Sequence, residues 1–139
     1  MEKIMKKILT LSKEQARTLH FLLSSHEVTN RSDNRKRFKF LEVIEDFVFE
    51  YDDKITEYQG KKLADVGKEL IRIGKEEKKF TFDDREVFAK VKDMFEKCFE
   101  TGTKLRDQAG KIASSPLVGK NAKIYVELED RFMDVVDVK

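Results

Sequence analysis

A chain of 139 residues suits one domain with one hydrophobic core, so we expect a single domain over residues 1–139. Charged residues make up 40% of the sequence, against a usual quarter, and asparagine and glutamine are scarce. This bias is thermophile-like. The 29 basic and 27 acidic residues nearly cancel, which argues against a general nucleic-acid binder because such proteins usually carry a larger basic excess.

Cysteine content and hydropathy limit where the protein works. Cys98 is the only cysteine, which excludes an internal disulfide and a cysteine zinc cluster and favours a reducing cytoplasm or a virion interior. No uninterrupted apolar run approaches about 18 residues, so we expect no membrane span. The basic, partly apolar N-terminal sequence lacks the long apolar core and cleavage site of a signal peptide.

A short strand and a helix are the first elements predicted along the chain. Ile4, Ile8 and Leu9 lie in a segment with strand character. Ser12 and Gln15 form a capping box, and apolar residues at helical spacing then continue to about residue 26. The link over residues 28–31 is short, which favours an antiparallel pair with the next helix.

Residues 32–58 contain neither glycine nor proline, and they predict a long helix capped by Ser32 or Asp33. Apolar residues recur there in steps of three and four, as in a helix that packs on another helix. They are Leu41, Ile44, Val48, Tyr51, Ile55 and Tyr58. Phe40, Val43 and Phe47 widen this seam into a broad core face, and acids occupy the opposite face.

Two aromatic residues of this helix lie outside its apolar seam. On a helical wheel, Phe38 and Phe49 project about 60–80° from Leu41. One interpretation is that a second element, such as the C-terminal segment, covers them. The other is that they form a partner interface.

Five basic residues crowd the start of the same helix: Arg31, Arg35, Lys36, Arg37 and Lys39. The helix dipole favours acids at this end, so local helix energetics do not explain the cluster. The bases are solvated, or they pair with acids elsewhere such as Asp83, Asp84 or the acidic tail. The other interpretation is that they bind phosphate, nucleic acid or an acidic partner.

The second half of the chain predicts a hairpin, a helix and a strand. Residues 69–73 and 80–82 alternate as two strands would, with a continued helix over the first as the alternative. A capping box at Asp83–Glu86 opens an apolar-faced helix that is expected to end at Gly102. Residues 114–121 resemble a loop, and residues 122–128 predict a strand. The tail fits either a strand or a helix.

No residue pattern indicates catalysis, metal binding or a cofactor. His20 and His26 are six residues apart and do not share a helix face. Cys98 falls on the apolar face of its helix, as a core residue would. The five Gly-Lys pairs lack the rest of a phosphate-binding loop, and the paired carboxylates lack a companion histidine. We therefore expect a non-enzyme without a cofactor.

The order of elements over residues 3–58 resembles small bacteriophage and prophage proteins of unknown function. The similarity rests on the HFLL motif at residues 20–23 and on the arginine-rich start of an acidic helix at RSDNRKRFKFLEVIEDFVFEY. It implies a viral accessory, assembly or host-interference role in the host cytoplasm or the virion. It brings no functional residues with it.

Together these patterns predict a mainly helical α+β domain, with an antiparallel helix pair, a third long helix and a small antiparallel sheet. We expect an interaction protein that binds a protein partner, including itself as a homodimer. The interface residues expected are Phe38, Phe49, Leu41, Ile44, Val48 and Tyr51. The alternative is a nucleic-acid-binding accessory protein that uses the basic cluster at residues 31–39.

Overall fold

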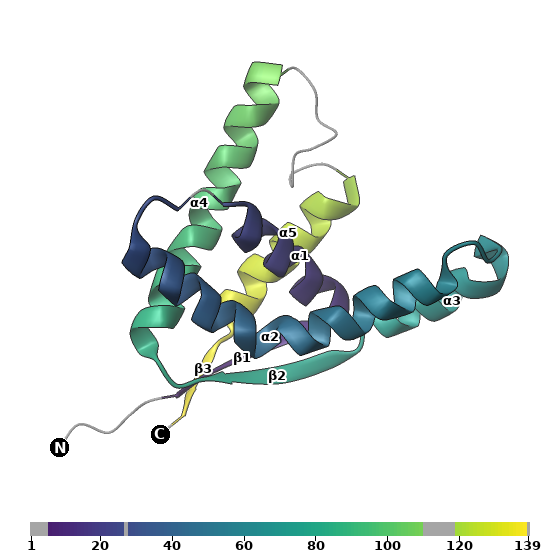
Figure 1. Cartoon of the computed structure of the whole chain (residues 1–139), viewed down its shortest axis with the longest axis horizontal. Helices are drawn as coiled ribbons and strands as arrows, with labels where there is room; N and C mark the ends of the chain where they lie inside the picture. The colour runs from purple at the N-terminus through teal and green to yellow at the C-terminus, as the bar shows by residue number, and fades with distance from the viewer. Residues whose placement is uncertain (1–5, 27, 110–118, 139) are drawn as a thin grey trace.

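The computed structural model describes residues 6–26, 28–109 and 119–138, and it places five helices and a three-stranded sheet in these ranges (Figure 1). The helices are α1 (Lys13–Ser25), α2 (Arg31–Tyr58), α3 (Leu63–Gly74), α4 (Arg85–Ala109) and α5 (Gly119–Met133). The strands are β1 (Lys6–Ser12), β2 (Glu77–Phe82) and β3 (Val136–Val138). The predicted mainly helical α+β fold is confirmed.

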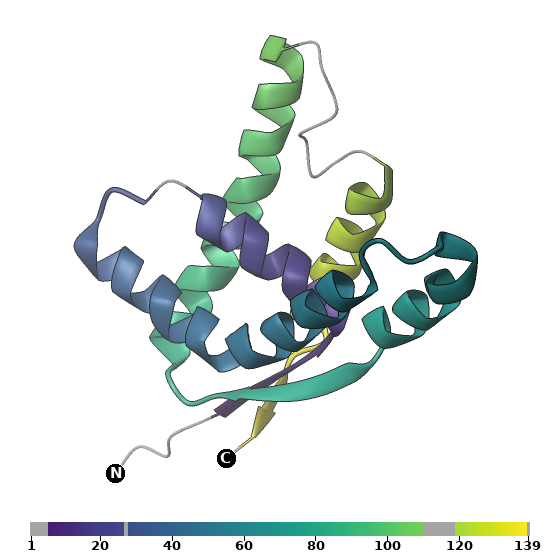
Figure 2. The same cartoon turned by 45° about the vertical axis from the view of Figure 1, so that its right-hand side comes forward.

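The sheet has β1 at its centre, with β2 and β3 antiparallel on either side. Leu9 lies opposite Phe80 in the register of β1 and β2. Both are buried, as are Leu11 and Phe82, whereas alternate residues such as Thr81 face solvent. The helices lie on one side of the sheet, over this buried face (Figures 1 and 2). The alternation of apolar and polar residues along β2 is therefore that of a half-buried strand.

A chain of aromatic rings forms the centre of the core and joins the helices to the sheet. Phe40 of α2 stacks on Phe82 of β2, with ring centroids 4.5 Å apart. Phe88 of α4 contacts both of these rings and also Phe132 of α5. Phe95 continues the chain to α5, because it stacks on a tyrosine whose hydroxyl donates to the Phe95 carbonyl. Such pairs stabilise a core beyond the area they bury.

Helices α1, α2 and α4 begin at residues that cap them, with two differences from the sequence prediction. The Ser12–Gln15 capping box is present at α1. At α2 the cap is Asn30, whose Oδ1 accepts from the amides of residues 32 and 33 at 2.8 and 3.3 Å, so the predicted Ser32 and Asp33 caps are wrong. At α4 the Asp84 carboxylate caps the amides of Glu86 and Val87. The capping residue thus stands one position after the predicted Asp83.

The predicted hairpin over residues 69–82 is wrong in its first half. Residues 69–73 belong to helix α3, and β2 pairs with β1 instead. Ile71 and Ile73 were expected on one strand face, but Ile73 is buried and Ile71 is 56% exposed. The helical face of α3 against α2 and α1 outweighs the local strand pattern. The second predicted strand, around Phe80, is confirmed.

The strand predicted over residues 122–128 is also wrong, because the segment belongs to α5. Ile124 and Leu128 are buried at a spacing of four, whereas Val126 between them is exposed, which is the pattern of a helix face and not of a strand. The tail forms strand β3. Helix α4 continues through Gly102 to Ala109, so that glycine is not its end. Of the predicted loop over residues 114–121, residues 119–121 belong to α5, and the rest lies outside the described residues, as does the predicted strand residue Ile4.

Gly74, the last residue of α3, allows a close approach to α2. A Cβ at this position would lie 2.8 Å from the Tyr51 hydroxyl and 3.3 Å from a Glu14 carboxylate oxygen. We expect Gly74→Ala to lower the free energy of unfolding by about 1–2 kcal/mol net, since overpacking outweighs the helix propensity of alanine. Urea denaturation measures this. Lys68→Ala, at an exposed position of the same helix, is the control and should change stability little.

Candidate functional sites

The apolar seam of α2 is internal. Leu41, Ile44, Val48 and Tyr51 are all buried within the chain, where α2 contacts α1, α4 and β2. Their prediction as an intermolecular surface is therefore wrong, because this chain already supplies the elements that cover them. Val43, predicted on the same face, is instead 41% exposed. The seam holds the domain together and leaves the other face of α2 as the candidate surface.

Phe38 and Phe49 are on that other face and remain in contact with solvent. Their exposed fractions are 54% and 45%, so no element of the described chain covers them as a core would. The Phe49 ring lies 6.0 Å from the His20 ring of α1, and the Arg37 guanidinium lies 5.8 Å from the Phe38 ring. These two large exposed rings make this face of the helix a candidate interaction surface.

The residues around these rings form a continuous stripe that we call the outer strip of α2. Its members lie within about 80° of one another on a helical wheel and point away from the buried seam. They are Arg31, Arg35, Phe38, Glu42, Glu45, Phe49 and Asp53. The strip is basic at its N-terminal end and acidic from its middle onward. Figure 2 shows α2 lying along the surface of the molecule.

The basic cluster separates into one structural arginine and four bases that are exposed or half-buried. Arg37 donates to the carbonyls of Leu23 and His26 at 3.0 and 2.6 Å, which satisfies the C-terminal end of α1. The four others make no ion pair within the described residues: Arg31, Arg35, Lys36 and Lys39. The suggested partners are engaged elsewhere, since Asp83 faces Lys6 at 3.9 Å and Asp84 caps α4.

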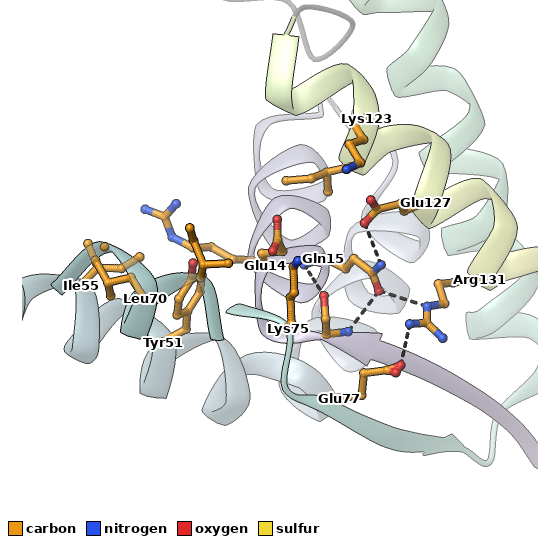
Figure 3. Close-up of a pocket in the computed structure, with 15 residues that line it drawn as sticks. Glu14, Gln15, Tyr51, Ile55, Leu70, Lys75, Glu77, Lys123, Glu127 and Arg131 are labelled. Carbon is orange, nitrogen blue, oxygen red and sulfur yellow. Dashed lines mark hydrogen bonds and ion pairs between the residues drawn. The ribbon is translucent and has the colours of Figure 1, made fainter. Parts of the chain in front are cut away.

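A second candidate site is a groove of about 870 Å³ between α3 and the α1–α5 side of the molecule (Figure 3). Such a volume is typical of small-molecule sites. Apolar side chains from α2 and α3 form one wall: Ile55, Leu70 and Ile71. Charged side chains from α1, α5, β2 and the α3–β2 link form the other: Glu14, Lys75, Glu77, Lys123, Glu127 and Arg131. Arg17 of α1 also lines the groove. The groove therefore has two chemically different walls.

Gln15 organises the floor of this groove through hydrogen bonds to three other residues. Its Oε1 accepts from the Ser12 amide at 3.0 Å and from Arg131 Nε at 3.1 Å. Its Nε2 donates to Glu127 at 3.0 Å. Arg131 in turn donates to Glu77 at 2.7 Å. Because Gln15 is 6% exposed and both the oxygen and the nitrogen of its amide are hydrogen-bonded, the floor is already arranged before any ligand binds.

Tyr51 closes the end of the groove nearest α3. Burial, and then the Glu14 carboxylate, raise the pKa of Tyr51 above its ordinary value. The phenol is therefore neutral and able to donate a hydrogen bond throughout the physiological range. Sequence reasoning placed Tyr51 in the seam, but the groove as a whole was missed. Its residues come from several elements, and the only local signal was the Ser12–Gln15 capping box.

The described residues contain no cluster of three or more histidine, cysteine, aspartate or glutamate side chains able to hold a metal ion. The Cys98 side chain lies outside the described part. None of the described helices is both long and apolar enough to cross a membrane. Comparisons with protein-family models, curated proteins and solved structures find no match to this chain.

Proposed function

We propose that this chain is a non-enzymatic interaction protein that self-associates through the outer strip of α2. The resemblance of residues 3–58 to phage proteins adds the proposal that it serves a viral accessory, assembly or host-interference role in the cytoplasm or virion. A single observation carries the proposal of self-association. The outer strip is solvent-exposed, and its order of aromatic and charged residues is complementary to that of a second copy of the strip that runs in the opposite direction.

The match is clearest at the two rings. Phe38 and Phe49 are equally distant from a point between Val43 and Ile44, and about 16 Å apart along the helix. When two copies of α2 pack antiparallel about a two-fold axis at that point, Phe38 of each copy meets Phe49 of the other. Such an interface is isologous, because both copies use the same residues. The two ring pairs would remove four exposed aromatic side chains from water.

The charges match in the same arrangement. Along the helix axis, Arg35 of one copy lies within about 1.5 Å of the level of Asp53 of the other, and this pair forms twice. Neither residue has an ion-pair partner among the described residues, so both are available. Glu42 and Glu45 face each other near the axis and oppose association. The rings and the outer charge pairs therefore provide the binding energy, and the central acids limit it.

The test is sedimentation equilibrium of the unmodified chain and of Phe38→Ser/Phe49→Ser. We expect the double variant to weaken dimerisation at least about 100-fold, since buried aromatic residues dominate interface energy. Met133→Ser, which changes an exposed apolar residue of α5, is the matched control and should leave dimerisation unchanged. Equal self-association of the double variant and the unmodified chain would contradict the proposal.

Nucleic-acid binding is the second candidate function, favoured by the four bases without carboxylate partners among the described residues. Lys36 and Lys39 separate the two functions, because they lie outside the outer strip on the wheel. If the cluster binds DNA, Lys36→Ala/Lys39→Ala should weaken binding to a short duplex and reduce its salt dependence. The same variant should dimerise normally if the outer strip is the functional surface.

A further inference from the structure

We propose that the groove between α3 and the α1–α5 side binds a small amphipathic anion, with an apolar body and a carboxylate or similar head. The site is separate from the outer strip of α2 and does not depend on self-association. Its two different walls, two cations that have no carboxylate partner in the described part of the chain, and the position of the α1 N-terminus all favour such a ligand.

The apolar wall gives the ligand its body. Ile71 is 56% exposed although α3 is otherwise packed against α2 and α1, and Leu70 and Ile55 beside it are only half-buried. Figure 3 shows Ile55 and Leu70 together on one side of the groove, away from Lys123, Glu127 and Arg131. A ligand that covers this wall would remove apolar surface from water, and the binding energy grows with the area covered.

The charged wall decides the sign of the head. Arg131 is engaged by Glu77 and Gln15, and Arg17 is engaged by Asp52 at 2.6 Å. Lys75 and Lys123 have no carboxylate partner within the described residues, and both line the groove. They are the cations available to a ligand. Charge-assisted bonds from lysine to a carboxylate are among the stronger hydrogen bonds in proteins.

The acids of the groove are less available than these lysines. Glu77 is neutralised by Arg131, and Glu127 already accepts from Gln15. Glu14 alone lacks a hydrogen-bond or ion-pair partner among the described groups, and it lies beside Tyr51 at the α3 end. The first turn of α1 also contributes Ser12, Glu14 and Gln15 to the lining, so the positive end of its dipole is at the groove. The balance favours an anion.

The probes are three ligands with one ten-carbon chain: decanoate, decanamide and decyltrimethylammonium. Titration calorimetry below the micellar range should show decanoate binding most tightly and the cation most weakly. Lys75→Gln/Lys123→Gln should weaken the binding of decanoate at least about tenfold, which is the effect of losing one charge-assisted hydrogen bond. The same variant should leave the binding of decanamide unchanged. Ile71→Ser should weaken decanoate and decanamide alike.

Lys78→Gln is the matched control, because Lys78 is an exposed lysine of β2 outside the groove. Thermal unfolding of each variant, compared with the unmodified chain, identifies loss of fold. The proposal is overturned if decanoate does not bind at about 1 mM, which is the weak end of specific affinity. It is also overturned if decanoate binds no more tightly than the cation. It is equally overturned if the folded double lysine variant binds decanoate as the unmodified chain does.

Discussion

Arg35→Glu alone and Asp53→Arg alone are each expected to weaken dimerisation strongly, and mixing the two variants is expected to restore it. In a homodimer of the first variant, the introduced glutamate would face Asp53 twice. In a homodimer of the second, the introduced arginine would face Arg35 twice. The mixed dimer has no pair of like charges at either end. At one end the introduced glutamate faces the introduced arginine, and at the other end the native Arg35 faces the native Asp53.

Like charges placed opposite one another at an interface cost several kcal/mol, so each variant alone should dimerise at least about 30-fold more weakly than the unmodified chain. The measurement is sedimentation equilibrium at low ionic strength, since exposed charges are screened within about 10 Å at 0.1 M salt. Arg85→Glu, at an exposed arginine that opens α4, is the control. Two monomeric variants that stay monomeric when mixed would contradict the antiparallel arrangement.

Phe40→Ala is expected to lower the free energy of unfolding by about 3–5 kcal/mol, the usual cost of removing a buried phenylalanine. Phe40 is fully buried, and it is the ring that joins α2 to both β2 and α4. Its neighbours are rings on separate elements, which cannot all move into the cavity. A domain of ordinary stability would lose a large share of its roughly 5–15 kcal/mol.

Urea denaturation of Phe40→Ala and the unmodified chain measures this difference. Phe21→Ala is the matched control, because Phe21 is 66% exposed on α1 and lies outside the outer strip. It should change stability by no more than about 0.5 kcal/mol. A cost of Phe40→Ala below about 1.5 kcal/mol, half the usual minimum, would show that the aromatic chain does not hold the core together.

The fold class and the first half of the chain could be predicted because local rules and tertiary structure agree there. Ser12 caps α1 as the capping box indicates, and the spacing of Leu41, Ile44 and Val48 identifies the buried face of α2. The dimer predicted through that face was wrong for a physical reason. Periodicity shows that a helix buries a face, but not whether the covering element belongs to the same chain.

The second half of the chain was harder to predict, because short apolar runs fit both the alternating pattern of a strand and the wider spacing of a helix. Ile71 and Ile73 suit a strand by alternation, yet α3 buries only the second of them. Ile124 and Leu128 suit a strand as well as a helix, and their packing between α1 and β1 decides for the helix. Local β-propensity is weak enough for tertiary contacts to override it.

The candidate sites differ in how much sequence alone reveals. Phe38 and Phe49 could be found because a helical wheel places both rings outside the seam. The groove could not, because Gln15, Lys75 and Arg131 are distant in sequence and meet only through the packing of α1, α5 and the α3–β2 link. A capping residue such as Gln15 also satisfies a local rule, which hides its second role.

The inter-copy distance at Thr56 tests the central claim most directly. A spin label on Thr56→Cys, with Cys98 replaced by Ser, changes no charge and lies near the end of the outer strip. Antiparallel pairing about the point between Val43 and Ile44 puts the two labels about 40 Å apart, from the helical rise and an interaxial distance of about 10 Å. We expect pulsed dipolar spectroscopy to give that distance. No inter-copy distance, or one below about 20 Å (half the value that the helical rise gives), would contradict self-association through α2 in this arrangement.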